Sequence, residues 1–149
     1  MIEVAITYHE DFGARGFSVL KERIRPSFEK LMQSGLVDGR EVQVFRPKPA
    51  PLALVETCHT AAHMKNMKDD PYQEVAMLSA GSVMMAAEMV ARGEARRAFA
   101  YTGTAGHHAS RGSCWGFCYF NDVAITIRRL REMGLQLSLI HISEPTGPY

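Results

Sequence analysis

Three short stretches of the chain are rich in β-branched and aromatic residues, and each predicts a strand. They are residues 2–8 (IEVAITY), 41–45 (EVQVF) and 97–101 (RAFAY). The polar, glycine-ended stretch at residues 9–13 predicts a loop after the first strand, and a proline-rich stretch at residues 47–51 ends the second. Long segments separate the strands, so the connections between them must carry further elements.

Those connecting segments repeat their apolar residues with the period of an α-helix. Residues 19–34 predict an amphipathic helix, which we expect Pro26 to break or restart. Residues 52–68 predict one or two short helices. Residues 74–91 are apolar on nearly every side, which predicts a buried central helix, and Asn121 is a good N-cap for a last helix.

Strands that alternate with helices predict an α/β fold with a mostly parallel sheet. In such folds, ligands bind in the loops at the carboxyl ends of the strands. The loop at residues 102–118 follows the third predicted strand and is dense in Gly, His, Ser and Cys. Candidate chemistry is therefore expected in this loop.

Composition narrows the class of protein. The chain has 149 residues with a formal net charge of +1, and its apolar share of 46% is typical of a globular protein with one core. The near-neutral charge argues against a nucleic-acid binder, and no uninterrupted apolar run approaches the length of a membrane span. No export signal is visible, so the three cysteines indicate reduced thiols and a cytoplasmic protein.

The adjacent residues His107 and His108 are the strongest candidates for catalysis. Imidazole titrates near neutral pH, so one ring can take a proton from water while its neighbour stabilises developing negative charge. Residue types alone do not decide between this hypothesis and two partly exposed loop histidines.

Other candidates favour structural interpretations. His59 and His63 have the i, i+4 spacing of metal ligands on a helix, but the residue after His59 is not the Glu of the zincin motif, which favours polar helix residues. Cys114 and Cys118 lack a second ligand pair, which favours buried or pocket-lining thiols.

Two linked motifs carry a family resemblance. Residues 106–109 (GHHA), followed by residues 116–122 (GFCYFND) and a helix, resemble the zinc-dependent histone deacetylase family. Residues 4–9 (VAITYH) look like its opening strand, and residues 55–63 (VETCHTAAH) look like its short histidine-bearing helix. The resemblance implies a partial three-layer α/β/α arginase/deacetylase-like fold with a mostly parallel sheet, like that of bacterial and archaeal acetoin-utilisation-type relatives.

The resemblance also implies roles for individual residues. His107 and His108 match the family's tandem active-site histidines, with His108 as the general base for a zinc-bound water and His107 as its electrostatic or acid partner. Gly116 and Phe117 match the wall of the tunnel that holds an acetyl-lysine side chain, and Cys118 would line the pocket near the zinc. The implied reaction is hydrolysis of an acetylated amine.

The family's zinc ligands, an Asp-x-His and a further Asp, have no counterpart in this sequence. We therefore expect no metal ligand here and no tight zinc binding by this chain. Residues 1–136 are expected to form the N-terminal part of a histone deacetylase-like domain, and residues 137–149 a non-native or disordered tail.

The expected function is that of a truncated deacetylase-like hydrolase, inactive as this chain. In the parent protein it would act on acetyl-lysine, acetylated polyamines or other small acetylated amines. The alternative is a non-catalytic binding or regulatory module that keeps the fold. An arginase-type ureohydrolase of the same superfamily is disfavoured, because that branch lacks the Gly-Phe-Cys spacing. The acyl group and the oligomeric state stay open.

Overall fold

A parallel sheet organises the molecule. The computed structural model describes residues 1–136, so the expectation for the tail at residues 137–149 lies outside the described residues. Strands β1 (Ile2–Thr7), β2 (Val42–Phe45) and β3 (Ala95–Ala100) form a three-stranded sheet in the order β2-β1-β3. Both pairings are parallel, which confirms the predicted sheet type.

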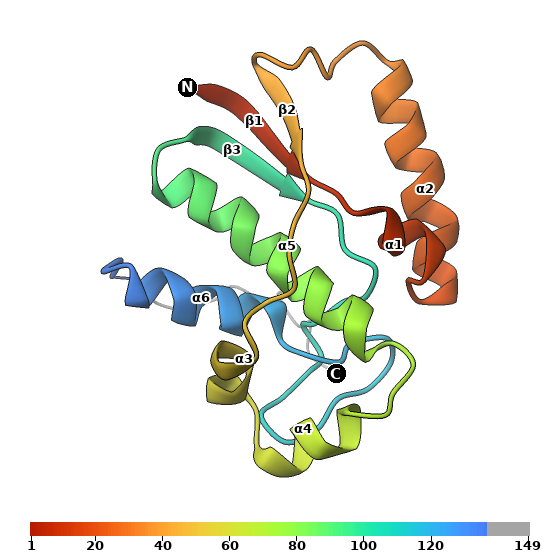
Figure 1. Ribbon diagram of the computed structural model, residues 1–149, viewed down its shortest axis with the longest axis vertical. Helices are drawn as coiled ribbons and strands as arrows, with labels where there is room; N and C mark the ends of the chain where they lie inside the picture. Colours follow the sequence, from red (N-terminus) through yellow and green to blue (C-terminus); the bar gives the residue numbers. More distant parts are fainter. Residues whose placement is uncertain (137–149) are drawn as a thin grey trace, which may run out of the picture.

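Helix α5 (Gln73–Ala91) runs along one face of the sheet (Figure 1). It is long and apolar enough to cross a membrane by length and composition, but 56% of its most apolar window is buried inside the protein. Its neighbours are β3 and β1 on one side and α6 (Asp122–Glu132) on the other. The predicted buried central helix is therefore confirmed, and it acts as the core helix of the fold.

The first helices differ from the sequence prediction. The expected loop after β1 contains a short helix, α1 (Glu10–Ala14), because the ring of Phe12 is fully buried and the His9 Nδ1 atom caps the helix by accepting from the Asp11 amide at 3.1 Å. Helix α2 (Ser18–Gln33) continues through Pro26 without a break. Glu22, whose carbonyl loses its helical partner at Pro26, is exposed, so water can satisfy that carbonyl.

Helices α1 and α2 pack where the strands β1 and β3 end. The ring of Phe28 stacks on Tyr8 with centroids 3.5 Å apart and meets Tyr101 edge-on at 5.7 Å. The buried side chains of Phe12 and Ile24 join Val75 and Leu78 of α5 in one core cluster. This cluster packs against the carboxyl end of the sheet, where Glu10 of α1 also pairs with Arg46 directly after β2.

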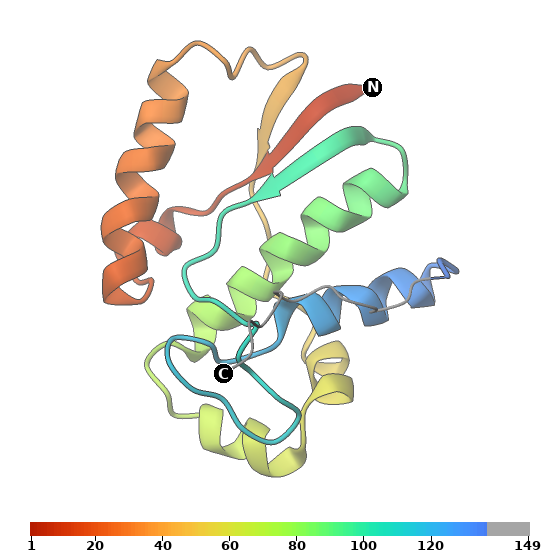
Figure 2. The ribbon, with the colours of Figure 1, turned by 180° about the vertical axis from the view of Figure 1, so that it is seen from behind.

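The remaining helices lie below the carboxyl end of the sheet. Helices α3 (Leu52–Cys58) and α4 (Ala61–Met67) confirm the expected pair of short helices, and α6 begins at Asn121, whose Oδ1 atom accepts from the Ala124 amide at 2.9 Å. Both ribbon views show the loop that follows β3 passing the end of α5 and running beside α4 before it enters α6 (Figures 1 and 2). The fold thus brings α3, α4 and this loop together.

Candidate active site

The loop at residues 102–121 is anchored at its start by a buried serine. The Ser79 hydroxyl, on α5, accepts from the backbone amides of Gly103 at 3.0 Å and Thr104 at 3.1 Å, while it donates to the Val75 carbonyl. The Ser79 side chain is 2% exposed, so these bonds hold the loop in a water-poor environment. The chain therefore leaves β3 in a defined direction.

An isolated parallel bridge joins the two halves of the loop. Ala105 pairs with Cys118, and the Ala105 amide donates to the Phe117 carbonyl at 3.0 Å. The bridge brings the histidine pair and the Gly116–Phe117–Cys118 stretch to the same place. The spacing in the sequence links these two motifs, and the structure joins them within one loop.

The two histidines are close to each other and to a tryptophan. The ring centroids of His107 and His108 are 4.1 Å apart at an interplanar angle of 52°. The His108 ring also stacks on Trp115, with centroids 3.9 Å apart. His107 is exposed and His108 is half-buried, so both rings can reach a substrate.

Gly106 brings the loop against the start of α6. A Cβ atom at this position would lie 2.3 Å from Asp122 Oδ1 and 2.4 Å from the Phe120 carbonyl oxygen, so only glycine fits. Burial raises the pKa of the Asp122 carboxyl, whereas the Val123 amide and the nearby His107 oppose that rise. A carboxylate thus lies electrostatically close to one member of the histidine pair.

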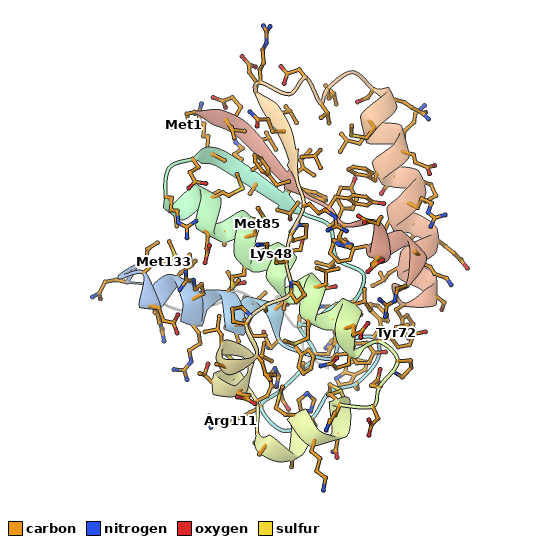
Figure 3. All side chains as sticks on the ribbon, viewed as in Figure 1. Met1, Lys48, Tyr72, Met85, Arg111 and Met133 are labelled. Atoms are coloured by element: carbon orange, nitrogen blue, oxygen red, sulfur yellow. The ribbon has the colours of Figure 1, made fainter. Side chains whose placement is uncertain are left out.

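Phe117 belongs to a row of aromatic side chains. Its ring centroid is 5.3 Å from that of Phe17, which is 5.3 Å from Tyr72, and Tyr72 is 5.6 Å from Tyr119. Gly116 has a φ angle of +64°, which turns the chain sharply before this row. The row makes an apolar wall on the part of the loop that the Ala105–Cys118 bridge joins to the histidine-bearing part, and Tyr72 is labelled at the start of α5 in Figure 3.

The cysteines confirm the expected buried or pocket-lining thiols. Cys118 is 1% exposed, and burial raises the pKa of its thiol. Cys58 and Cys114 are half-buried, and burial also raises the pKa of the Cys114 thiol. All three are free and, at neutral pH, Cys114 and Cys118 stay protonated.

Comparisons with known proteins agree with this arrangement. The model of the histone deacetylase domain matches residues 70–142, which include the whole loop. A probable deacetylase from Archaeoglobus fulgidus is 25% identical over 150 residues, covering 88% of this chain and 42% of that protein. Human histone deacetylase 9 is 43% identical over 67 residues, or 45% of this chain and 6% of that protein.

Residues 70–142 match the histone deacetylase domain, so the chain carries part of a histone deacetylase-like domain. The crystal structure of the HDA15 HD domain has the same fold, with a TM-score of 0.77 and 20% identity, over 89% of this chain and 44% of that one. The chain thus spans less than half the length of these relatives. The α/β arginase/deacetylase-like fold expected from the sequence is confirmed.

Members of the histone deacetylase family generally use zinc, which needs several converging His, Cys, Asp or Glu side chains. Within residues 1–136, no group of three or more His, Cys, Asp or Glu side chains converges in a way that could hold a metal ion. The residues present therefore do not make a complete zinc site, and no step of the chemistry below is assigned to the metal.

His63 lies in a helix as expected, whereas His59 is the C-cap of the preceding helix, so the two side chains do not share one helix face. His59 ends α3, His63 lies in α4, and the two side chains are 3% and 2% exposed. Their rings stack with centroids 4.7 Å apart and meet Phe120 edge-on. Polar spacing alone could not reveal this, because burial depends on the distant loop that covers them.

Sequence reasoning also missed Trp115, Phe17 and Tyr72 at this histone deacetylase-type loop. Trp115 carried a usable signal, since it is the single tryptophan of the chain and lies between the two motifs. Phe17 and Tyr72 carried none, because they come from segments far from the loop in sequence and meet it only through the tertiary fold.

Proposed function

We propose that this chain contributes the histidine pair and one wall of a deacetylase site, which in the full-length protein hydrolyses acetylated amines. The observation that carries the proposal is the joining of the His107–His108 pair to the Phe117 wall by the bridge between Ala105 and Cys118. This loop lies within the stretch that matches the histone deacetylase domain.

In the proposed reaction, His108 acts as a general base and removes a proton from the attacking water. The water oxygen forms a bond to the acetyl carbon, and the bond from that carbon to the amine nitrogen then breaks. The proton passes to the leaving amine, so the products are acetate and a free amine. His107, the second ring of the pair, serves as the electrostatic or acid partner, and zinc ligands are proposed to come from outside the described residues.

The substrates proposed are acetyl-lysine, acetylated polyamines or other small acetylated amines in the cytoplasm. An extended methylene stem needs an apolar wall, and the Phe117 ring with its neighbour Phe17 supplies one. Gly116 leaves that wall open, because a glycine places no side chain in front of it. Cys118, buried and protonated, is proposed to line the inner end of the pocket.

A second candidate is a non-catalytic binding module with the same fold. It is favoured by the row of aromatic rings that runs from Phe117 to Phe17 and Tyr72, which can pack on a ligand without any bond being broken. Such a module would bind an acetylated side chain on the aromatic wall without breaking its amide bond. Binding without turnover separates it from the enzyme proposal.

The test is a deacetylation assay on the full-length protein encoded by the genomic DNA, with acetyl-lysine peptides and acetylated polyamines as substrates. We expect turnover, and we expect His108→Ala to lower kcat/KM by a factor on the order of 10² to 10⁴. Arg128→Ala, on the exposed face of α6, is the matched control and should leave the rate unchanged. Binding of these ligands without hydrolysis would replace the enzyme proposal by the binding module.

A further inference from the structure

The segment at residues 59–63 holds the site loop at separate points along its length. The Thr60 amide donates to the Arg111 carbonyl at 2.8 Å, near the tip of the loop beside α4 (Figure 3). The Nε2 atom of His63 lies 2.8 Å from the Tyr119 carbonyl oxygen, and the Nε2 atom of His59 lies 3.1 Å from the Asn121 amide nitrogen. This short segment therefore contacts the loop at its tip and at its end.

The partners of the two imidazoles determine where their protons lie. A backbone carbonyl only accepts, so His63 must donate from Nε2 to Tyr119, which makes it an Nε2–H imidazole. A backbone amide only donates, so the Nε2 atom of His59 must accept from Asn121 and carry no proton. The proton of a neutral His59 therefore lies on Nδ1, and the two stacked rings have opposite tautomers.

The environment of the pair favours two neutral rings. Both side chains are almost fully buried, and the stacked rings are 4.7 Å apart, so a charge on one would lie next to the other without water. The Nδ1 atom of His59 is buried and has no hydrogen bond of good geometry among the described residues, although the backbone of Ser110 and Arg111 lies close enough to favour a proton on the ring. A proton on Nδ1 therefore faces backbone groups of the loop, as the Nδ1–H tautomer requires.

The role of His59 and His63 can be inferred from the residues to which they are hydrogen-bonded. Tyr119 and Asn121 directly follow the Phe117–Cys118 wall, and Asn121 also caps α6 and donates from Nδ2 to the Ala109 carbonyl at 2.8 Å. Ala109 comes directly after His108. His63 thus contacts the stretch after Phe117 and Cys118 through Tyr119. His59 is linked to the histidine pair through Asn121, which in turn bonds to Ala109.

We propose that His59 and His63 are positioning residues, fixed as opposite neutral tautomers, that hold the wall and the histidine pair of the site in register. The proposal rests on the proposed function for the identity of the site, but the tautomers and the clamping contacts do not depend on catalysis. It assigns a role to a histidine pair that the deacetylation chemistry leaves unused.

The first experiment uses the unchanged chain and long-range ¹⁵N–¹H NMR of its imidazoles at neutral pH. We expect His59 as the Nδ1–H tautomer and His63 as the Nε2–H tautomer. An Nε2–H proton on His59, or an imidazolium in either ring at neutral pH, would overturn the proposal. This measurement needs no variant and so does not depend on whether a variant folds.

The second experiment compares His59→Gln with His59→Leu. The glutamine side chain can place its oxygen where Nε2 accepts from Asn121, whereas leucine fills the space without an acceptor. We expect roughly tenfold faster amide exchange of Asn121 in His59→Leu and exchange close to the parent in His59→Gln. Equal exchange in the two variants would refute positioning through this hydrogen bond. If the unchanged full-length protein shows no deacetylase activity while the tautomers and the exchange rates are as expected, only the proposed function is refuted.

Discussion

The imidazole of His108 stacks on the indole of Trp115, with ring centroids 3.9 Å apart and an interplanar angle of 29°. Trp115 is 65% exposed, so one face of its indole meets His108 while much of the rest is open to solvent. Because the chain has a single tryptophan, its fluorescence reports on this contact alone.

We predict that His108→Ala exposes the second face of Trp115. Quenching of its emission by acrylamide should rise, and the free energy of unfolding should fall by about 0.5–1 kcal/mol as the aromatic contact is lost. His107→Ala is the control, because His107 neighbours His108 but has no stacking contact with Trp115 among the described residues. Equal quenching in both variants would contradict the stacked arrangement.

Gly106 is predicted to be intolerant of any side chain. In Gly106→Ala, the new methyl group would lie 2.3 Å from Asp122 Oδ1, so the loop or the start of α6 must move. We expect a loss of about 1–3 kcal/mol in the free energy of unfolding, measured with urea.

The matched control for this prediction is Gly112→Ala in the same loop. A Cβ atom there meets nothing closer than the Thr60 hydroxyl at 3.7 Å, so stability should stay within about 0.5 kcal/mol of the parent. If both alanine variants unfold at the same urea concentration, the close approach of the loop to α6 is wrong.

The elements that could be predicted from the sequence are those whose local pattern favours the same structure as their tertiary contacts. The apolar α5 segment favours burial, and the sheet on one side and α6 on the other bury more than half of its most apolar window. Asn121 is an N-cap by its own side-chain chemistry, whatever packs around it. The candidate site could be predicted from the linked motifs at residues 106–122, because both motifs lie in one loop that the Ala105–Cys118 bridge holds together.

Sequence reasoning failed where the deciding contact comes from a distant segment. Residues 9–13 are polar in composition, which predicts a loop. The buried Phe12 side chain packs in a core cluster with residues of α5, and this packing stabilises the short helix α1. Pro26 did not interrupt α2, since Glu22, whose carbonyl loses its helical partner, is an exposed residue. The spacing of His59 and His63 carries no sign of their burial, which comes from the loop after β3 that covers them.

The stability of the chain is predicted to depend on pH through His59. Burial first, and then the neighbouring His63, lower the pKa of His59 below 6.5, so the unfolded state binds a proton at a pH where the folded state does not. The stability associated with this group should be complete above pH 6.5. It should fall as the pH drops through 6.5 toward the lower pKa of the folded state.

Urea unfolding between about pH 5 and pH 8 measures this dependence. The expected control is His59→Gln, which keeps an acceptor for Asn121 but does not titrate, and whose stability should change less over the same range. A slope that is unchanged in His59→Gln would assign the pH dependence to other groups.

Zinc is predicted not to bind the 149-residue chain tightly, because no three potential ligands converge within its described residues. Isothermal titration with zinc chloride should show no stoichiometric site, and the chain alone should not hydrolyse an acetyl-lysine peptide. Stoichiometric zinc together with turnover would overturn this prediction. The full-length protein, assayed in parallel, separates a missing metal site from a wrong substrate class.

The open edge of β3 is predicted to make the chain self-associate. Among the described residues β3 pairs only with β1, and beside it lies an apolar groove of about 440 Å³ between α5 and α6, lined in part by Val83, Val90 and Leu130. Phe99, on β3, is 57% exposed. An unpaired strand with apolar surroundings is a template for pairing with another chain.

We expect Phe99→Lys to reduce this association, since a lysine on an edge strand opposes strand pairing. Light scattering and sedimentation velocity at several protein concentrations would measure the change. Leu36→Lys is the matched control, because Leu36 is 65% exposed but lies in the connection between α2 and β2, away from this edge. A monomeric parent chain with a sharp cooperative melt, or equal effects of the two lysines, would show that the β3 edge does not drive association.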